Sequence, residues 1–327
     1  MSKVLIKFKN HMTFKNKKIS LLGFGAWGLG GDAYGEISNQ KSLNLLKYSI
    51  ANGVNFIDTS NIYGKGLSEK RIGLLLLKNK KIRPKLFVAT KCGTKNHSPS
   101  SWIMPQNFKV SYLKKSIEQS LKRLNTSYVD LIQLHSPPLK LLKNKKEIKK
   151  ILNLFIELKK KKKIKYFGIS TKSPEDALFV LKNYKSFKFI QLNFNLIDQR
   201  ALDCGALDLA QKKGVSMIAR TPLAFGYLAG KVNIKGKDHR KKWSKKQKDL
   251  WSKGRLEFTK VINRKNINST ILALLFATYH PAIKTAIPGM MKIKDVKENL
   301  KFLNSKKLTK KEVRKLIFFY KKNQWVA

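Results

Sequence analysis

The sequence predicts an α/β protein folded as a closed (β/α)8 TIM barrel, with a short N-terminal hairpin and a C-terminal helical extension. Counted from Leu21, eight short apolar runs typical of buried parallel strands alternate with eight helical patterns. The 327 residues, 42% of them hydrophobic, can bury one large core, and we expect a single domain over residues 1–327. Polar side chains directly follow several of the apolar runs. In a barrel of this kind they would meet at the C-terminal ends of the strands.

The N-terminal region is predicted to form the hairpin and then the first barrel strand. Residues 4–8 and 12–14 are two short apolar pieces that can pair ahead of the barrel. Residues 19–27 follow as a strand and run into a glycine-rich loop that ends near Gly31. These glycines do not form the G-x-G-x-x-G pattern of a dinucleotide-binding βαβ unit. We therefore expect a loop whose backbone approaches a ligand.

The second, third and fourth strands deliver the residues around which the chain is organised. The apolar run of residues 54–57 stops at Asp58, and a turn-forming segment then brings Tyr63. The strand of residues 86–90 ends at Lys91, and prolines stop the next strand at His135. Four polar side chains are thus predicted at one end of the barrel.

The rest of the chain continues the alternation. A basic helix is expected in the long loop between the last two strands. The further strands are predicted at residues 164–169, 187–193, 215–220 and 283–287. The further helices are predicted at residues 40–52, 111–124, 147–162, 174–184, 202–213, 269–279 and 293–304.

The formal net charge of +51 comes from 70 Lys and Arg residues against 19 Asp and Glu residues. Such an excess attracts phosphates in general, including nucleic acids and anionic membranes. The lysines are spread along the chain at positions where a helix would face solvent, and no nucleic-acid-binding motif accompanies them. We therefore interpret the charge as a solvated coat, and expect no specific nucleic-acid partner.

The cysteine count and the lengths of the apolar stretches argue against disulfide-rich, zinc-binding, membrane and secreted proteins. Cys92 and Cys204 are too few for a disulfide framework or a four-ligand zinc site, and we expect no metal. Cys92 is interpreted as a packing residue. No segment has the apolar length of a membrane span or the pattern of a secretion signal, so a cytoplasmic location without membrane contact is expected.

An ordered series of motifs resembles the aldo-keto reductases. The series spans most of the chain and keeps the order of that family. Its members are Phe56-Ile57-Asp58-Thr59, Tyr63-Gly64, Ser68-Glu69, Ala89-Thr90-Lys91, Leu131 to His135, Gly168-Ile169-Ser170, Gln191 to Asn195, Pro222-Leu223-Ala224, Gly226, Gly230-Lys231, Ile287-Pro288-Gly289 and Glu298-Asn299. The resemblance implies a (β/α)8 barrel that reduces aldehydes or ketones with NADPH or NADH and without a metal.

Carbonyl reduction explains why these residue types belong together. Hydride addition leaves an alkoxide that needs a proton, and the phenol of Tyr63 can donate one if its pKa of about 10 is lowered. An ammonium at Lys91 would lower that pKa, and a carboxylate at Asp58 would keep the ammonium charged. His135 would then orient the carbonyl oxygen. The substrate is a small-molecule carbonyl compound, and its identity and the oligomeric state stay open.

The resemblance also implies a set of cofactor contacts. Gly25 would lie against the cofactor, Ser170 and Gln191 would hold the nicotinamide carboxamide, and Trp27 would line the substrate pocket. A loop would cover the pyrophosphate, and two residues would contact the adenine. The loop residues are Pro222, Leu223, Gly226, Gly230 and Lys231, and the adenine residues are Glu298 and Asn299.

Four positions depart from the common pattern of the family. Thr171 stands in place of an asparagine, and Arg220 in place of a tyrosine that stacks on the nicotinamide. Met291 and Asp295 occupy places where an arginine often binds the 2′-phosphate of NADP. Lys292 and Lys294 could supply that charge, which favours NADP(H), with NAD(H) as the alternative.

Two other functions are compatible with the sequence. A barrel lyase could form a Schiff base through Lys91, which borohydride trapping would detect. A non-catalytic binding or regulatory protein could keep the aldo-keto reductase fold without turnover. Cofactor binding and a panel of aldehydes would separate that protein from a reductase.

Overall fold

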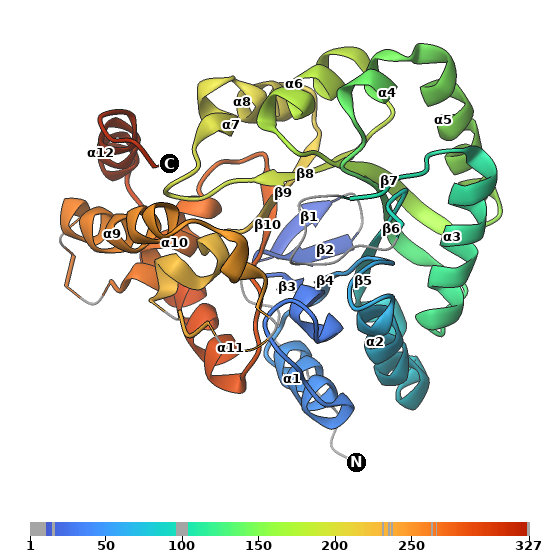
Figure 1. The fold of residues 1–327 in the computed structure, drawn as a ribbon, viewed down its shortest axis with the longest axis horizontal. Helices are drawn as coiled ribbons and strands as arrows, with labels where there is room; N and C mark the ends of the chain where they lie inside the picture. Colours follow the sequence, from blue (N-terminus) through green and yellow to red (C-terminus); the bar gives the residue numbers. More distant parts are fainter. Residues whose placement is uncertain are drawn as a thin grey trace.

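The computed structural model describes residues 11–14, 17–95, 104–230, 232–234, 236, 238–262, 264–265 and 267–325. Its centre is an eight-stranded parallel sheet rolled into a barrel, with helices on the outside (Figure 1). The strands follow the chain in order around the sheet. They are β3 (Phe24–Gly25), β4 (Phe56–Asp58), β5 (Phe87–Cys92), β6 (Val129–His135), β7 (Ile164–Ser170), β8 (Phe189–Asn193), β9 (Ser216–Arg220) and β10 (Ile283–Ile287).

Two isolated parallel bridges join the first and last strands, Leu22 with Ala286 and Gly25 with Gly289. The amide of Gly25 donates to the Pro288 carbonyl at 3.0 Å. A Cβ atom on Gly25 would lie 2.7 Å from the Ile287 carbonyl oxygen, so only glycine allows the two backbones to meet here. The predicted closed barrel is thus confirmed, and closure is itself a physical reason for glycine at position 25.

The helices between the strands pack their apolar faces on the barrel. Side-chain caps begin several of them, at Ser38, Asn144, Ser173 and Asn268. The helices are α1 (Asn39–Ala51), α2 (Leu67–Lys78), α3 (Val110–Arg123), α4 (Leu139–Lys143), α5 (Lys145–Lys160), α6 (Pro174–Asn183), α7 (Arg200–Asp203), α8 (Ala206–Lys212), α9 (Lys245–Ile262), α10 (Ser269–Ala277), α11 (Ile293–Leu300) and α12 (Lys310–Lys321). Short 3-10 helices are η1 (Ala26–Gly30), η2 (Lys80–Lys85), η3 (Ala224–Ala229), η4 (His239–Lys242) and η5 (Lys301–Asn304).

The barrel interior is packed at one end and open at the other. An inner cluster of buried side chains fills the N-terminal end, separate from the larger core between strands and helices. The inner cluster comprises Ile19, Phe56, Phe87, Ala89, Leu131, Phe189, Ile218 and Ile287. Polar side chains at the opposite, C-terminal strand ends surround a cavity of about 940 Å³. This is the end at which barrel active sites are built.

The N-terminal hairpin differs from the expectation. Residues 4–8 lie outside the described part of the chain, and residues 12–14 belong to β1 (His11–Phe14). The partner of β1 is β2 (Lys17–Ser20), in antiparallel pairing, so part of the predicted first barrel strand belongs to the hairpin instead. Asn55 holds the hairpin to the barrel, because its side chain accepts from the Ser20 amide at 2.8 Å and donates to the Lys18 carbonyl at 2.8 Å.

One predicted helix is divided. The helix expected over residues 202–213 forms α7 and α8, which meet at Gly205 with a φ of 72°. That conformation lies in the left-handed region and ends a helical run. The last strand, the basic helix α9 and the C-terminal helix α12 are confirmed.

Candidate active site

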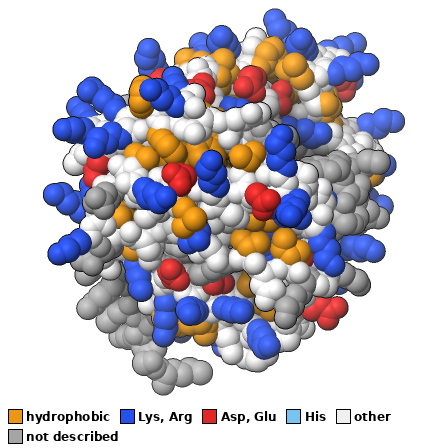
Figure 2. Space-filling view, turned by 60° about the vertical axis from the view of Figure 1, so that its left-hand side comes forward, with side chains coloured by type: hydrophobic (Ala, Val, Ile, Leu, Met, Phe, Trp, Pro, Cys, Tyr) orange, Lys and Arg blue, Asp and Glu red, His pale blue; other side chains and the backbone are white. Residues whose placement is uncertain are grey.

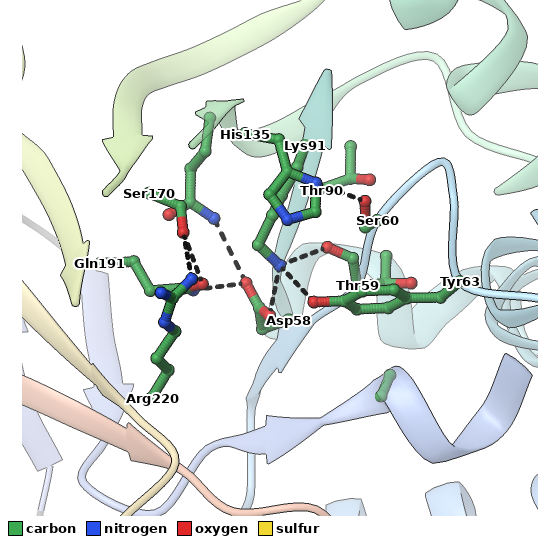
Figure 3. A network of polar contacts seen from close by, with 12 residues as sticks. Asp58, Thr59, Ser60, Tyr63, Thr90, Lys91, His135, Ser170, Gln191 and Arg220 are labelled. Carbon is green, nitrogen blue, oxygen red and sulfur yellow. Dashed lines mark hydrogen bonds and ion pairs between the residues drawn. The ribbon is translucent and has the colours of Figure 1, made fainter. Parts of the chain in front are cut away.

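The ammonium of Lys91 is the centre of a buried hydrogen-bond network (Figure 3). Its Nζ lies 2.6 Å from Asp58 Oδ2, 2.8 Å from the Thr59 carbonyl oxygen and 3.2 Å from the Tyr63 hydroxyl. An ammonium has three protons to donate, and these three contacts use all of them. The side chain of Lys91 is fully buried, so Lys91 and Asp58 form a buried ion pair, and the Tyr63 hydroxyl is hydrogen-bonded to it.

The strands place these groups through their parallel register. Asp58 ends β4 and Lys91 lies near the end of the neighbouring strand β5. Tyr63 comes from the turn that follows β4. That turn packs tightly against the loop after β3. A Cβ atom on Gly64 would lie only 2.1 Å from the Gly30 carbonyl oxygen, so the two backbones can approach this closely only with glycine at position 64.

Two glutamines hold the second oxygen of Asp58. Gln133 on β6 donates to Oδ1 at 3.2 Å, and Gln191 on β8 donates to the same atom at 2.8 Å. A carboxylate that accepts from several donors is held in one orientation. The sequence motif that ends at His135 contains Gln133, but nothing local indicated that its amide would support Asp58.

Burial and charge act in opposite directions on Tyr63. Burial raises its pKa above the ordinary value and the negative charge of Asp58 adds to that effect, while Lys91 and Arg220 lower the pKa without cancelling the rise. The expectation that the phenol pKa lies below its ordinary value is therefore wrong for the protein alone. Burial opposes the charge on Lys91 as well, but Asp58 and Tyr63 outweigh it and raise the pKa of Lys91. At neutral pH the phenol keeps its proton and the amine keeps its charge.

His135 ends β6 and lines the cavity beside Tyr63, with the two ring centres 6.3 Å apart. Its Nδ1 lies 3.2 Å from the hydroxyl oxygen of Ser60. The Ser60 hydroxyl can donate either to this nitrogen or to Asn61 Oδ1, also at 3.2 Å. If it donates to Nδ1, the proton of a neutral His135 resides on Nε2.

Arg220 replaces the expected aromatic residue with a firmly held cation. Its guanidinium donates to Asn193 Oδ1 at 2.7 Å, to the Thr171 carbonyl at 2.9 Å and to Ser170 Oγ at 3.1 Å. Ser170 in turn lies 3.3 Å from Gln191 Oε1. A chain of contacts therefore connects Arg220 through Gln191 to Asp58, as Figure 3 shows.

Most of the sequence-predicted site residues border the same cavity. The cavity lining includes Gly25, Trp27, Asp58, Tyr63, His135, Gln191, Pro222, Leu223, Gly226, Gly230, Lys292, Lys294 and Asn299. Lys91, Ser170 and Glu298 are outside that lining, and Lys231 lies outside the described residues. Asn299 is 1% exposed, and neither its amide oxygen nor its amide nitrogen has a hydrogen-bond partner among the described residues. An orphaned amide at the cavity wall fits a polar ligand there.

The N-terminus of α11 presents charges of both signs to the cavity. Asp295 Oδ2 accepts from the amides of Met291 at 3.0 Å and Lys292 at 3.1 Å. The Asp295 carboxylate thus satisfies donors of its own helix start. Lys292 and Lys294 are exposed and border the same end of the cavity.

Part of the cavity wall is formed by residues that the sequence did not indicate. Tyr34, Phe225, His239 and Trp243 line it together with Trp27. The backbones of Tyr34 and Asp238 form an isolated antiparallel bridge, although about 200 positions separate them in the chain. Only the approach of the two loops brings this aromatic wall together.

The predictions about metal sites, membrane-spanning helices and the role of Cys92 concern features that the described residues can be searched for. Within them, no group of three or more His, Cys, Asp or Glu side chains has the arrangement of a metal site. No helix among them has the length and apolar character that a membrane crossing requires. Cys92 is fully buried and burial raises its pKa, as fits a packing residue.

The fold and the site together are an eight-stranded parallel barrel with an Asp–Lys–Tyr hydrogen-bond network at its C-terminal end. The sequence model of the Aldo/keto reductase family matches residues 21–317. That match covers most of the chain, which therefore belongs to the aldo/keto reductase family. The predicted family and fold are both confirmed.

Several named proteins are similar over nearly the whole length. An uncharacterized oxidoreductase, YqkF of Bacillus subtilis, is 29% identical over 307 residues, which cover 91% of this chain and 92% of that protein. L-galactose dehydrogenase of Arabidopsis thaliana is 26% identical, covering 86% of this chain and 84% of its own. The holo form of aldo-keto reductase AKR11C1 from Bacillus halodurans has a TM-score of 0.76 at 25% identity, with 95% of each chain covered. These similarities support an oxidoreductase.

Proposed function

We propose that the protein reduces an aldehyde or ketone to an alcohol with a nicotinamide cofactor, and that Tyr63 donates the proton. One observation carries the proposal: Lys91 Nζ lies 2.6 Å from Asp58 and 3.2 Å from the Tyr63 hydroxyl, and these two partners line a cavity large enough for cofactor and substrate. The cofactor, when bound, supplies the hydride.

Each side chain has a distinct part in the proton transfer. The raised pKa of Tyr63 keeps the phenol protonated at neutral pH, as a proton donor requires. Negative charge that develops on the phenol oxygen as the proton leaves is stabilised by the Lys91 ammonium. Asp58 and its two glutamines hold that ammonium in place. His135 would orient the carbonyl oxygen through Nε2, with Ser60 donating to Nδ1.

The environment of Lys91 disfavours the Schiff-base alternative. A lyase lysine must lose its proton to become a nucleophile. Here the carboxylate of Asp58 and the phenol of Tyr63 raise the pKa of Lys91 although burial opposes its charge, and all three ammonium protons are donated. The amine is also fully buried, so a substrate carbon would have no direct approach to it.

The charge at the start of α11 favours NADPH over NADH. Lys292 and Lys294 border the cavity, while the carboxylate of Asp295 is bonded to two backbone amides. The two ammonium groups therefore exceed the single carboxylate, and their charge would attract a 2′-phosphate. Asn299 would donate and accept at the adenine end.

The test of the proposed chemistry is the substitution Tyr63→Phe. Removing the hydroxyl should lower kcat by at least about a hundredfold, because the general acid is lost, while the Kd of NADPH changes little. Turnover should be followed at 340 nm with a panel of aldehydes and ketones. Sugar aldehydes belong in that panel because L-galactose dehydrogenase is named for a sugar.

Tyr48→Phe is a matched control, since Tyr48 lies on α1 and does not line the cavity. It should behave as the wild type. Undiminished turnover in Tyr63→Phe would remove Tyr63 from the mechanism. Cofactor binding without turnover of any carbonyl compound by the wild type would favour the non-catalytic alternative.

A further inference from the structure

His239 is a histidine in the cavity wall with no part in the proton-transfer network. It begins η4 and is only 1% exposed. Its ring centre lies 4.4 Å from that of Trp27, 4.8 Å from that of Tyr34 and 5.1 Å from that of Phe225. The imidazole thus stands among three aromatic rings in the wall of the cavity.

Neither ring nitrogen of His239 has a hydrogen-bond partner among the residues that the structure describes. Burial among the rings lowers the pKa of His239 to about 3, so the imidazole is neutral and offers one donor and one acceptor. Leaving such groups buried without partners is unfavourable, and native proteins rarely keep them without a reason. A ligand bound in the cavity could supply the hydrogen bond that the ring nitrogens of His239 lack.

The backbone holds the ring at this place. The amide of His239 donates to the Ala33 carbonyl at 2.9 Å, beside the bridge between Tyr34 and Asp238. Arg240 locks the same loop through contacts with Asp238 at 2.6 Å and with the Phe225 carbonyl at 3.2 Å. These hydrogen bonds fix the position of the loop, and with it the position of the imidazole.

The ring also lies close to the reacting end of the site. Trp27 connects the two places, because its ring centre is 6.0 Å from that of Tyr63 and 4.4 Å from that of His239. A molecule whose carbonyl meets Tyr63 would extend over Trp27 toward His239.

We propose that His239 determines substrate specificity by hydrogen-bonding a hydroxyl group of a neutral hydroxylated aldehyde or ketone. The inference rests on the proposed carbonyl reduction. A hydroxyl both donates and accepts, as neutral imidazole does, so the pair is complementary. The aromatic rings cover the carbon chain of the substrate and exclude water from this bond.

A hydroxyl fits better than a carboxylate at this position. Neutral imidazole brings no charge to pair with an anion, and the guanidinium of Arg240 is already bound to the carboxylate of Asp238. Lys242, the other cation of η4 at the cavity wall, is partly buried, and burial lowers its pKa and so disfavours its charged form. An acidic aldehyde therefore serves as the competing substrate class in the test.

The experiment compares matched substrates on the full-length protein with NADPH. D-Glyceraldehyde, D-erythrose and D-xylose are each paired with the alkanal of equal chain length, and succinic semialdehyde represents the anions. The wild type should prefer the hydroxylated member in kcat/KM. In His239→Phe that preference should fall roughly tenfold to a hundredfold, mainly through KM, because the ring keeps its shape and loses both nitrogens.

His239→Gln restores a neutral donor and acceptor, and should recover part of the preference. Phe225→Leu changes the same wall without changing a polar group, so it should alter both members of each pair alike. A preference that is equal in wild type and His239→Phe, or highest for succinic semialdehyde, would overturn the inference while carbonyl reduction stands. No turnover of any carbonyl compound would overturn the proposed function, and the inference with it.

A second readout does not depend on turnover. In protein labelled with 15N-histidine, one of the five histidines should lose its signals in His239→Phe, which assigns the ring. Adding erythritol to the wild-type NADP complex should shift the assigned ring-nitrogen signals, whereas 1-butanol should not. Unmoved signals at saturating erythritol would also contradict a hydroxyl bond to His239.

Discussion

At the scale of single residues, the site depends on a balance between burial and charge. Burial raises the pKa of Tyr63, and the neighbouring ammonium of Lys91 offsets part of that effect. The proton donor is therefore protonated at rest, and the charge that forms during the reaction is stabilised by a group already in place. Reduction requires the protonated phenol and should be lost as the pH rises through the Tyr63 pKa.

Lys91→Met tests this coupling. Without the ammonium, the pKa of Tyr63 should rise further, so the alkaline limit of the pH profile should move to higher pH. The rate should fall at the same time by at least about tenfold, because the phenolate loses its stabilising charge. The measurement is kcat/KM against pH for wild type and variant.

A methionine at position 91 leaves the carboxylate of Asp58 without its partner, which destabilises the fold. The double variant Asp58→Asn with Lys91→Met removes both charges and provides the control. A smaller alkaline displacement should be seen in it, because the Asp58 carboxylate, which raises the Tyr63 pKa, is removed as well. A measurable rate with an unmoved alkaline limit in both variants would show that Lys91 does not set the phenol pKa.

At the scale of elements, a buried ion pair joins α2 to α3. Glu69 is fully buried, and its carboxylate accepts from Arg123 at 2.7 Å and from Thr90 at 2.5 Å. Arg123→Ala should lower the free energy of unfolding by about 3 kcal/mol, the lower part of the range for such losses, because Arg123 is 21% exposed. Urea denaturation followed by circular dichroism measures the change.

The surface pair of Lys150 with Glu147 on α5 is the matched control at a similar distance of 2.7 Å. Lys150→Ala should leave the midpoint almost unchanged, since exposed pairs contribute little. Equal losses of unfolding free energy in the two variants would mean that the burial of Glu69 does not make its ion pair more stabilising than an exposed one.

The start of α11 determines the choice of cofactor in our proposal. Replacing Lys292 and Lys294 together by alanine should remove most of the preference for NADPH over NADH, on the order of 1–3 kcal/mol. Titration of both reduced cofactors, followed by quenching of tryptophan fluorescence, gives the two Kd values. Lys297→Ala on the same helix is the control, because Lys297 does not border the cavity.

A wild type that binds NADH more tightly would contradict the proposal for the two lysines. The carboxylate of Asp295 would then dominate the 2′ position, despite its bonds to the Met291 and Lys292 amides. In that case Asp295→Arg should turn the preference toward NADPH.

At the scale of the whole molecule, the feature to explain is the formal net charge of +51. Figure 2 shows Lys and Arg side chains distributed across the visible face, with Asp and Glu among them. Binding to DNA or RNA should therefore be non-specific and should nearly vanish by physiological salt. Fluorescence anisotropy of labelled duplexes of different sequence, at increasing salt concentration, measures this. A sequence-selective complex that persists at high salt would contradict the interpretation as a solvated coat.

The sequence alone determined the barrel and its main catalytic candidates. Strand and helix periods are local properties, so the alternation could be read directly, and β10 lies where it was predicted. Asp58, Lys91 and His135 were found because each lies at or near the end of an apolar run, and parallel strands bring such ends together. The ordered motifs then pointed to the family that the comparison shows.

Only the tertiary structure decided how those side chains are supported and what surrounds them. The sign of the Tyr63 pKa shift depends on burial by distant segments, and the glutamines that hold Asp58 come from β6 and β8. The sequence shows that residues 12–14 and 19–20 both have strand character, but only the folded structure shows that β1 pairs with β2. His239 carries no local signal at all. It joins the site because two loops far apart in the chain meet there, and such an approach is a property of the folded molecule rather than of either segment.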